Sequence, residues 1–177
     1  MSKVIVAKDL VLGYKNEIII NKGNFSLNSG DFVFLTGASG SGKTTILKHL
    51  YGELKPKSGY LNIGGFDMNK ISNSKLNYLR RYIGIVFQDY KLIKDWTIEK
   101  NVKLPLIIAG LNENIQDKKV TKYLSKVKLL HRADKYPFEL SGGEQQRAAI
   151  IRAIVNEPVL VLGDEPTGNL DDYSSSL

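Results

Sequence analysis

Residues 37–44 form the first pattern whose residue types and spacing could do chemistry. They are Gly37, Ala38, Ser39, Gly40, Ser41, Gly42, Lys43 and Thr44. Glycines at this spacing let backbone N–H groups surround a phosphate, and the start of a helix adds partial positive charge. Lys43 would then reach the β- and γ-phosphates and Thr44 would bind Mg²⁺. A glycine-rich turn beside a surface lysine is the alternative.

An acidic pair, Asp164 and Glu165, follows the apolar run 159–162. Parallel sheets place ligands at the carboxyl ends of their strands. There Asp164 could hold Mg²⁺, and Glu165 could orient or deprotonate a water that attacks the γ-phosphate. Two solvated carboxylates opening a turn at Pro166 are the alternative.

A third pattern stands at the start of a predicted helix. It consists of Leu140, Ser141, Gly142, Gly143, Glu144, Gln145, Gln146 and Arg147. The serine hydroxyl, the bare glycine backbone and the helix start together predict a second anion site. One nucleotide cannot readily fill two such sites in one small domain, so the sequence predicts a composite site between two copies.

The elements that must position these patterns alternate between strands and helices. We expect strands or hairpin arms at 4–11, 17–27, 31–36, 59–65, 83–87 and 159–162, with 31–36 buried on both faces. We expect helices from 43 to Gly52, over 115–130 and over 143–156, with the stretch 89–139 as a helical insertion. No run approaches the roughly 20 apolar residues of a membrane span.

Composition limits the classes of function without choosing one. The 177 residues are 42% apolar and 24% charged, which is typical of a globular domain. There is no cysteine, which excludes disulfides, thiolate metal sites and a cysteine nucleophile and suits a reducing compartment. The net charge of +7 allows an anionic partner such as a nucleotide, a nucleic acid or an acidic membrane, although the charge alone favours the simpler interpretation of a solvated lysine-rich surface.

The three patterns, in this order, resemble the nucleotide-binding domain of ABC ATPases over the whole chain. The resemblance implies an α/β P-loop NTPase with a RecA-like parallel core, an N-terminal antiparallel β subdomain and an inserted helical subdomain. It implies one domain over 1–177: the β subdomain and phosphate-loop half of the core at 1–88, the helical subdomain at 89–139, and the signature helix, acidic strand and D-loop at 140–177.

The resemblance also assigns roles to residues. It implies ATP and Mg²⁺ as ligands, with Glu165, Lys43 and Gln88 catalytic and with Thr44, Gln88 and Asp164 around the metal. Tyr14 would stack on adenine, although a turn tyrosine after Gly13 is the alternative, and Thr45 would join the phosphate loop. The signature residues 140–145 would contact ATP bound by the opposite subunit of a head-to-tail homodimer. The loop through which the subunits sense each other would contain Asn169, Leu170 and Asp171.

A narrower resemblance concerns the cell-division branch of the family. It rests on residues 36–40, 87–89, 105–110 and 166–171, and lipoprotein-releasing and macrolide-exporting ATPases are near relatives. It implies an ATPase on the inner face of the cell membrane, driving an integral membrane partner that docks on the helical subdomain. The stretch with Tyr90, Leu92 and Trp96 is the candidate docking surface, with ordinary packing as the alternative.

Other classes of ABC protein remain as alternatives. A DNA- or ribosome-associated member would suit the positive charge. However, the interval from Gly37 to Ser141 is too short for a long coiled coil, and no tandem second domain follows. We therefore expect no nucleic acid partner.

The chain departs from the family at its C-terminus, where the family carries a switch histidine on a later strand. Neither His49 nor His131 matches it by position, and we expect both to be structural or exposed. We therefore expect a C-terminally incomplete domain with an exposed sheet edge, exposed apolar surface, lower stability and a tendency to self-associate. An ATP-binding fragment without efficient hydrolysis is the corresponding alternative function.

Overall fold

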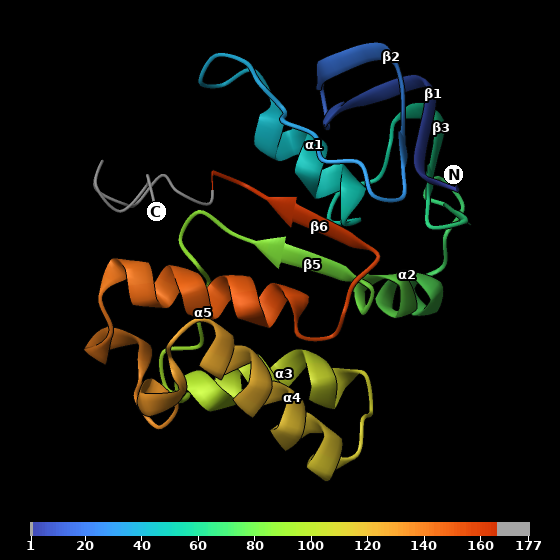
Figure 1. The fold of residues 1–177 in the computed structure, drawn as a ribbon. Coiled ribbons are helices and arrows are strands. Elements are labelled where there is room, and N and C mark those ends of the chain that lie inside the picture. Colours follow the sequence, from blue (N-terminus) through green and yellow to red (C-terminus); the bar gives the residue numbers. More distant parts are fainter. Residues whose placement is uncertain (1, 166–177) are drawn as a thin grey trace. The chain divides into compact units, whose positions relative to one another are not determined.

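The computed structural model describes residues 2–165, and the chain divides into two compact units, residues 1–80 and 81–177. The D-loop residues Asn169, Leu170 and Asp171 lie outside the described residues. The units are described one at a time, each by its own elements (Figure 1).

The first unit is built on an antiparallel sheet. Its strands are β1 (Lys3–Tyr14), β2 (Glu17–Asn28), β3 (Ser58–Ile63) and β4 (Phe66–Asp67), in the order β2-β1-β3-β4. Two helices complete the unit, α1 (Lys43–Leu50) and α2 (Asn73–Arg80). The predicted N-terminal antiparallel sheet and the helix that stops at Gly52 are confirmed; Gly52 has φ +73°, which glycine adopts without strain.

The alternation of buried and exposed side chains along β1 shows which face of the strand points into the core and where the strand contains an extra residue. Ile5 and Ala7 are buried, and so are Leu10 and Leu12, so the buried positions change from odd to even numbers. Strand side chains alternate with period two, so this change requires one extra residue. The pairing registers with β2 and β3 both shift at this point, where Asp9 has φ +45°. A β-bulge therefore keeps both halves of β1 facing the same core.

The second unit combines a short parallel sheet with helices. Strands β5 (Ile83–Val86) and β6 (Leu160–Gly163) pair in parallel, and the helices are α3 (Ile98–Ile108), α4 (Glu113–Lys126) and α5 (Gly142–Ile154). Two 3₁₀ turns, η1 (Leu130–Arg132) and η2 (Pro137–Glu139), lead into α5. Figure 1 shows β5 and β6 side by side, with α5 running along them and α3 and α4 beyond it.

The core of the second unit follows helical spacing. Ile98, Val102 and Leu106 of α3 recur every four residues and are fully buried. They pack with residues of α4, of α5 and of its C-cap, namely Val120, Leu124, Ala148, Ile151 and Val155. The predicted helical insertion and signature helix are confirmed, although the helix predicted over 115–130 ends at Lys126, before Lys128 at φ +57°.

Helix α5 approaches strand β5 very closely. A Cβ atom built on Gly84 would lie 2.2 Å from the carbonyl oxygen of Ala153. No side chain fits there, so a glycine at this position allows the signature helix to rest directly on the strand that leads to Gln88.

The prediction for residues 31–36 is wrong in this structure. The segment is neither helix nor strand, and Phe32 and Phe34 are 83% and 79% exposed. A buried strand needs neighbouring strands to pair with its backbone hydrogen-bonding groups and other elements to cover its two faces. Within residues 2–165 no strand pairs with this segment. The second apolar strand is also only partly buried, because Leu162 is enclosed while Val159 and Val161 are exposed.

Candidate functional site

The phosphate loop lies in the first unit and leads directly into α1. Gly42 is the N-cap of α1, with φ +93° and no side-chain hydrogen bond to the helix start. The Lys43 ammonium donates to the carbonyl oxygens of Gly37 and Ala38, both at 3.0 Å. The loop thus satisfies the Lys43 ammonium with its own backbone carbonyls, and a bound phosphate would compete with them for that charge.

Two further predicted residues come together beside the loop. The Thr45 hydroxyl donates to the Tyr14 hydroxyl at 3.4 Å, and Thr45 is buried while Tyr14 remains 42% exposed. Tyr14 ends β1, and β1 pairs with β2 up to Glu17, so the sheet brings this ring to the start of α1. The ring is free enough to meet a flat ligand, as the role expected of Tyr14 requires.

The parallel pairing of β5 with β6 brings three of the predicted site residues to one edge of the sheet. Val86 lies opposite Gly163 in the register, and the Asp164 amide donates to the Val86 carbonyl at 3.0 Å. Gln88 follows β5, while Asp164 and Glu165 follow β6, so all three stand at the carboxyl end of the sheet. Glu165 has φ +44°, a strained backbone that is common at functional sites.

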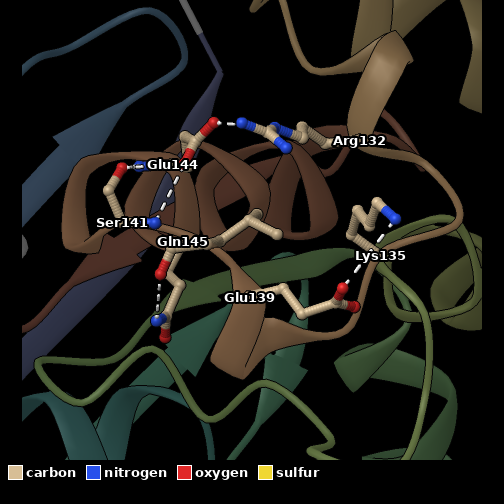
Figure 2. A network of polar contacts seen from close by, with 7 residues as sticks. Arg132, Lys135, Glu139, Ser141, Glu144 and Gln145 are labelled. Carbon is tan, nitrogen blue, oxygen red and sulfur yellow. Dashed lines mark hydrogen bonds and ion pairs between the residues drawn. The ribbon is translucent and has the colours of Figure 1, made fainter.

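The signature begins helix α5 with a complete capping box (Figure 2). The Ser141 hydroxyl accepts from the Glu144 amide at 3.3 Å and donates to the Glu144 carboxylate at 2.9 Å. The Ser141 amide donates to the same carboxylate oxygen at 2.9 Å. The structure therefore brings the predicted anion-binding serine into contact with a negatively charged side chain of its own helix.

The Glu144 carboxylate is held ionised by its surroundings. The Ser141 backbone N–H is the largest cause of a pKa lowered from the ordinary glutamate value, followed by the Ser141 hydroxyl, with Arg132 contributing less. The Arg132 guanidinium lies 3.4 Å from the second carboxylate oxygen. Figure 2 shows Arg132 reaching Glu144 from outside the signature, while Lys135 and Glu139 form a separate pair at 3.8 Å.

Three further residues support this unit and were not predicted from the sequence. Arg132 pairs with Glu144, and Arg152 donates to the carbonyl oxygens of Tyr90 and Lys91. The fully buried Asn101 side chain accepts from the Ile93 amide at 2.7 Å. Arg132 and Arg152 read as ordinary basic residues at helix ends, so the sequence carries no signal for these contacts.

The candidate docking surface needs correction. Tyr90 is 6% exposed and Leu92 packs against the helical core, so both belong to the interior of the second unit. Aromatic and aliphatic side chains after a strand pack inward when a helical core lies beside them. Trp96 is partly exposed, with the Lys100 ammonium 5.7 Å above its ring. His49 is fully buried and His131 is exposed, as expected for residues without a catalytic role.

The residues expected around a metal fit Mg²⁺ better than a metal with many protein ligands. Within residues 2–165 no three acidic or histidine side chains gather into a metal-binding group. Mg²⁺ usually takes one or two carboxylates and completes its shell with phosphate oxygens and water. A hydroxyl such as that of Thr44 and one carboxylate such as that of Asp164 suit that chemistry.

No helix within the described part of the chain is long and apolar enough to cross a membrane.

The comparisons with known proteins agree with this geometry. The family model described as ABC transporter matches residues 20–168. The chain is 47% identical to the cell division ATP-binding protein FtsE of Escherichia coli K12 over 151 residues, which is 85% of this chain and 68% of the relative. It is 42% identical to FtsE of Streptococcus pneumoniae D39 and 40% identical to FtsE of Bacillus subtilis 168, each over 97% of this chain and 75% or 76% of the relative.

A solved structure has the same fold. The dimeric structure of a post-hydrolysis state of the ATP-binding cassette MJ0796, bound to ADP and Pi, superposes with a TM-score of 0.86 at 35% identity. The match covers 97% of this chain and 78% of that chain. The predicted fold class is thereby confirmed, and the chain belongs to the ABC transporter family of ATP-binding cassettes.

Proposed function

We propose that this chain is the ATP-hydrolysing subunit of an ABC-type membrane complex that acts in bacterial cell division. The observation that carries ATP hydrolysis is the β5–β6 register, because it sets Gln88, Asp164 and Glu165 at one sheet edge. The cell-division role rests on the 40–47% identity to FtsE proteins of several bacteria.

In the proposed reaction, the phosphate loop binds ATP and the acidic edge activates water. Lys43 leaves the carbonyls of Gly37 and Ala38 and binds the β- and γ-phosphates. Glu165 accepts a proton from the attacking water, whose oxygen forms the new bond to the γ-phosphorus as the bond to ADP breaks. Thr44, Asp164 and Gln88 would hold Mg²⁺, which neutralises phosphate charge when bound.

Two copies would complete each ATP site. The signature residues 140–145 would contact the γ-phosphate held by the opposite subunit. They would do so through the backbone amides at the start of α5 and the Ser141 hydroxyl. The support is physical, because a helix start with glycines at Gly142 and Gly143 attracts an anion, and a nucleotide bound in the phosphate loop of the same chain would already have its own site. The dimeric neighbour structure supports such pairing.

A membrane partner would receive the motion of this dimer. For the cell-division branch we propose an integral membrane protein of the FtsX type, docking on the helical part of the second unit, with the chain peripheral on the inner face of the membrane. The α3–α4 region presents apolar side chains to solvent, because Ile107, Ile108 and Ile115 are each about half exposed. Together with Trp96 they replace Tyr90 and Leu92 as the candidate contact.

Calorimetry with Mg-ATP, followed by a turnover assay, tests the proposal. We expect binding by the unaltered chain, loss of about 100-fold in affinity for Lys43→Ala, and binding without turnover for Glu165→Gln. Lys75→Ala removes an exposed lysine of the same unit and should bind as the unaltered chain does. Equal ATP affinity in Lys43→Ala and Lys75→Ala would contradict the proposed phosphate site.

A further inference from the structure

An arginine outside every predicted motif joins the signature helix to the segment after Gln88. Arg152 lies in the last turn of α5. Its guanidinium donates to the carbonyl oxygen of Tyr90 at 2.6 Å and to that of Lys91 at 2.7 Å. Burial lowers the pKa of Arg152 from its ordinary value, so these two carbonyls replace the water that the cation has lost. The contact spans more than 60 residues of sequence.

The backbone that Arg152 holds is strained. Tyr90 has φ +58° and Lys91 has φ +47°, two consecutive left-handed residues of which neither is glycine. Such conformations are costly and persist only where surrounding contacts impose them. Both carbonyls that Arg152 contacts belong to these residues, so the guanidinium acts where the strain lies.

Further contacts within this segment join near neighbours in the sequence, and one of them runs from the Lys91 amide to the Asp89 carbonyl at 2.6 Å. The Asp89 and Lys91 side chains form an ion pair at 2.7 Å, but each is about 60% exposed, and exposed pairs stabilise little. The Tyr90 amide donates to Phe87 at 3.0 Å within the same turn. Arg152 adds two charge-assisted bonds from a different element, and bonds to a charged donor are stronger than neutral ones.

We propose that Arg152 is a positioning residue for Gln88. It fixes the backbone that follows Gln88 in its left-handed turn and ties that turn to α5, the helix that begins at Ser141. The proposal rests on the proposed function only for the role of Gln88 at the metal. Since a helix rises about 1.5 Å per residue, α5 connects the signature and the Gln88 turn as one stiff rod of roughly 15 Å. A contact at Ser141 is therefore linked through the body of α5 to the turn that directly follows Gln88 in the same chain.

Limited proteolysis and hydrogen exchange of the full chain test the hold on the turn. Trypsin cleaves after Lys91, whose side chain is exposed. We expect Arg152→Gln to raise cleavage after Lys91 and amide exchange over residues 88–92 by about tenfold, because two charge-assisted bonds are lost. Arg152→Lys keeps the charge but loses the fork, so it should give a smaller rise and remains testable if the glutamine variant fails to fold.

A matched control is available in the first unit. Arg80 donates from Nε to the Tyr51 carbonyl at 3.2 Å and from a terminal nitrogen to the Gly52 carbonyl at 2.9 Å. Arg80→Gln therefore removes an equivalent arginine–carbonyl clamp and should leave cleavage after Lys91 unchanged. Cleavage after Lys91 that stays at the unaltered level in both Arg152 variants, or rises equally in Arg80→Gln, would overturn the proposal.

Turnover separates positioning from general stability. We expect Arg152→Lys to keep the ATP dissociation constant within about twofold while turnover falls about tenfold and requires more Mg²⁺, as in Gln88→Ala. Equal losses of ATP affinity and turnover in Arg152→Lys would indicate a merely structural role and would overturn the proposal that Arg152 positions Gln88. Should Gln88→Ala itself leave turnover and Mg²⁺ dependence unchanged, the proposed role of Gln88 fails, while the proteolysis result still decides whether Arg152 holds the turn.

Discussion

Two helix starts in this chain carry motifs for phosphate, and they are prepared in opposite ways. Helix α1 begins at Gly42, which offers no side chain to cap its amides. Helix α5 begins at Ser141, whose hydroxyl and amide are bonded to Glu144 in a complete capping box. A phosphate can therefore cap α1 directly, whereas at α5 it must compete with a carboxylate already in place.

The difference indicates an order of events for the proposed composite site. The start of α1 would be the primary phosphate site, because its helix amides and Lys43 would gain a partner when phosphate binds. At the start of α5, the polar groups of Ser141 are already hydrogen-bonded to Glu144 of the same helix. This helix start would therefore bind ATP only when a second copy brings the γ-phosphate close to it. The capping box would thus disfavour stray anions at the signature.

Gly42→Ala should have the largest effect, because it destroys the start of α1. Gly42 has φ +93°, and a Cβ there would lie 2.1 Å from the Ile19 Cγ2 atom. We expect a loss of about 2 kcal/mol in the free energy of unfolding, together with loss of ATP binding. Urea unfolding and calorimetry measure both.

Gly110→Ala serves as the control for Gly42→Ala. Gly110 also has a positive φ, +77°, but nothing lies within 4 Å of its Cβ position. It should cost about 1 kcal/mol and leave ATP binding intact. Identical ATP affinity in the two variants would show that the α1 start does not bind phosphate.

Glu144→Ala removes the carboxylate half of the capping box of α5 and tests the comparison from the other side, because the backbone amide of residue 144 can still donate to the Ser141 hydroxyl. Losing the two bonds to the carboxylate should cost about 1 kcal/mol of stability or less. The variant also releases the hydroxyl proton of Ser141 from its carboxylate partner and removes a negative charge, so we expect it to bind free phosphate at the signature more readily. Urea unfolding and phosphate titration by NMR measure the two effects; a variant as stable as the unaltered chain would contradict the capping role.

We expect His49 to make the stability of helix α1 sensitive to acid. It is fully buried, its Nδ1–H donates to the Thr45 carbonyl at 2.7 Å, and burial lowers its pKa from the ordinary value of 6.5. The unfolded chain therefore binds the proton more readily, and this stability is present above pH 6.5 and is lost as the pH falls through 6.5 toward the folded-state pKa. Urea midpoints at pH 7.5 and about 5.5 should differ in the unaltered chain and differ less in His49→Phe.

Arg132→Gln should have the smallest effect. The pair with Glu144 lies at 3.4 Å and the Arg132 side chain is 40% exposed, so its loss should cost about 0.5 kcal/mol or less. The effect should vanish when Glu144 is already alanine, which a double-mutant cycle measures. An effect of the same size in both backgrounds would place the role of Arg132 elsewhere.

The sequence predicted most of the motifs and elements, because glycine spacing, capping residues and helical periodicity are local signals. The phosphate loop, the strand before Gln88 and the helix after Ser141 all lie where these signals indicated. The segment with Phe32 and Phe34 was mispredicted, because burial depends on neighbours that a local pattern does not contain. The contacts of Arg152 and Asn101 could not be predicted for the same reason. Both side chains donate to backbone carbonyls, and only the folded chain shows which carbonyls lie within reach.

Mixing two inactive variants tests the composite site most directly. Lys43→Ala disables the phosphate loop and Ser141→Arg disables the signature, so neither should hydrolyse ATP alone. If the signature acts on the opposite subunit, a mixture should recover about a quarter of the unaltered rate, because half of the dimers are mixed and each keeps one intact site. A mixture that stays inactive while forming mixed dimers would contradict the account.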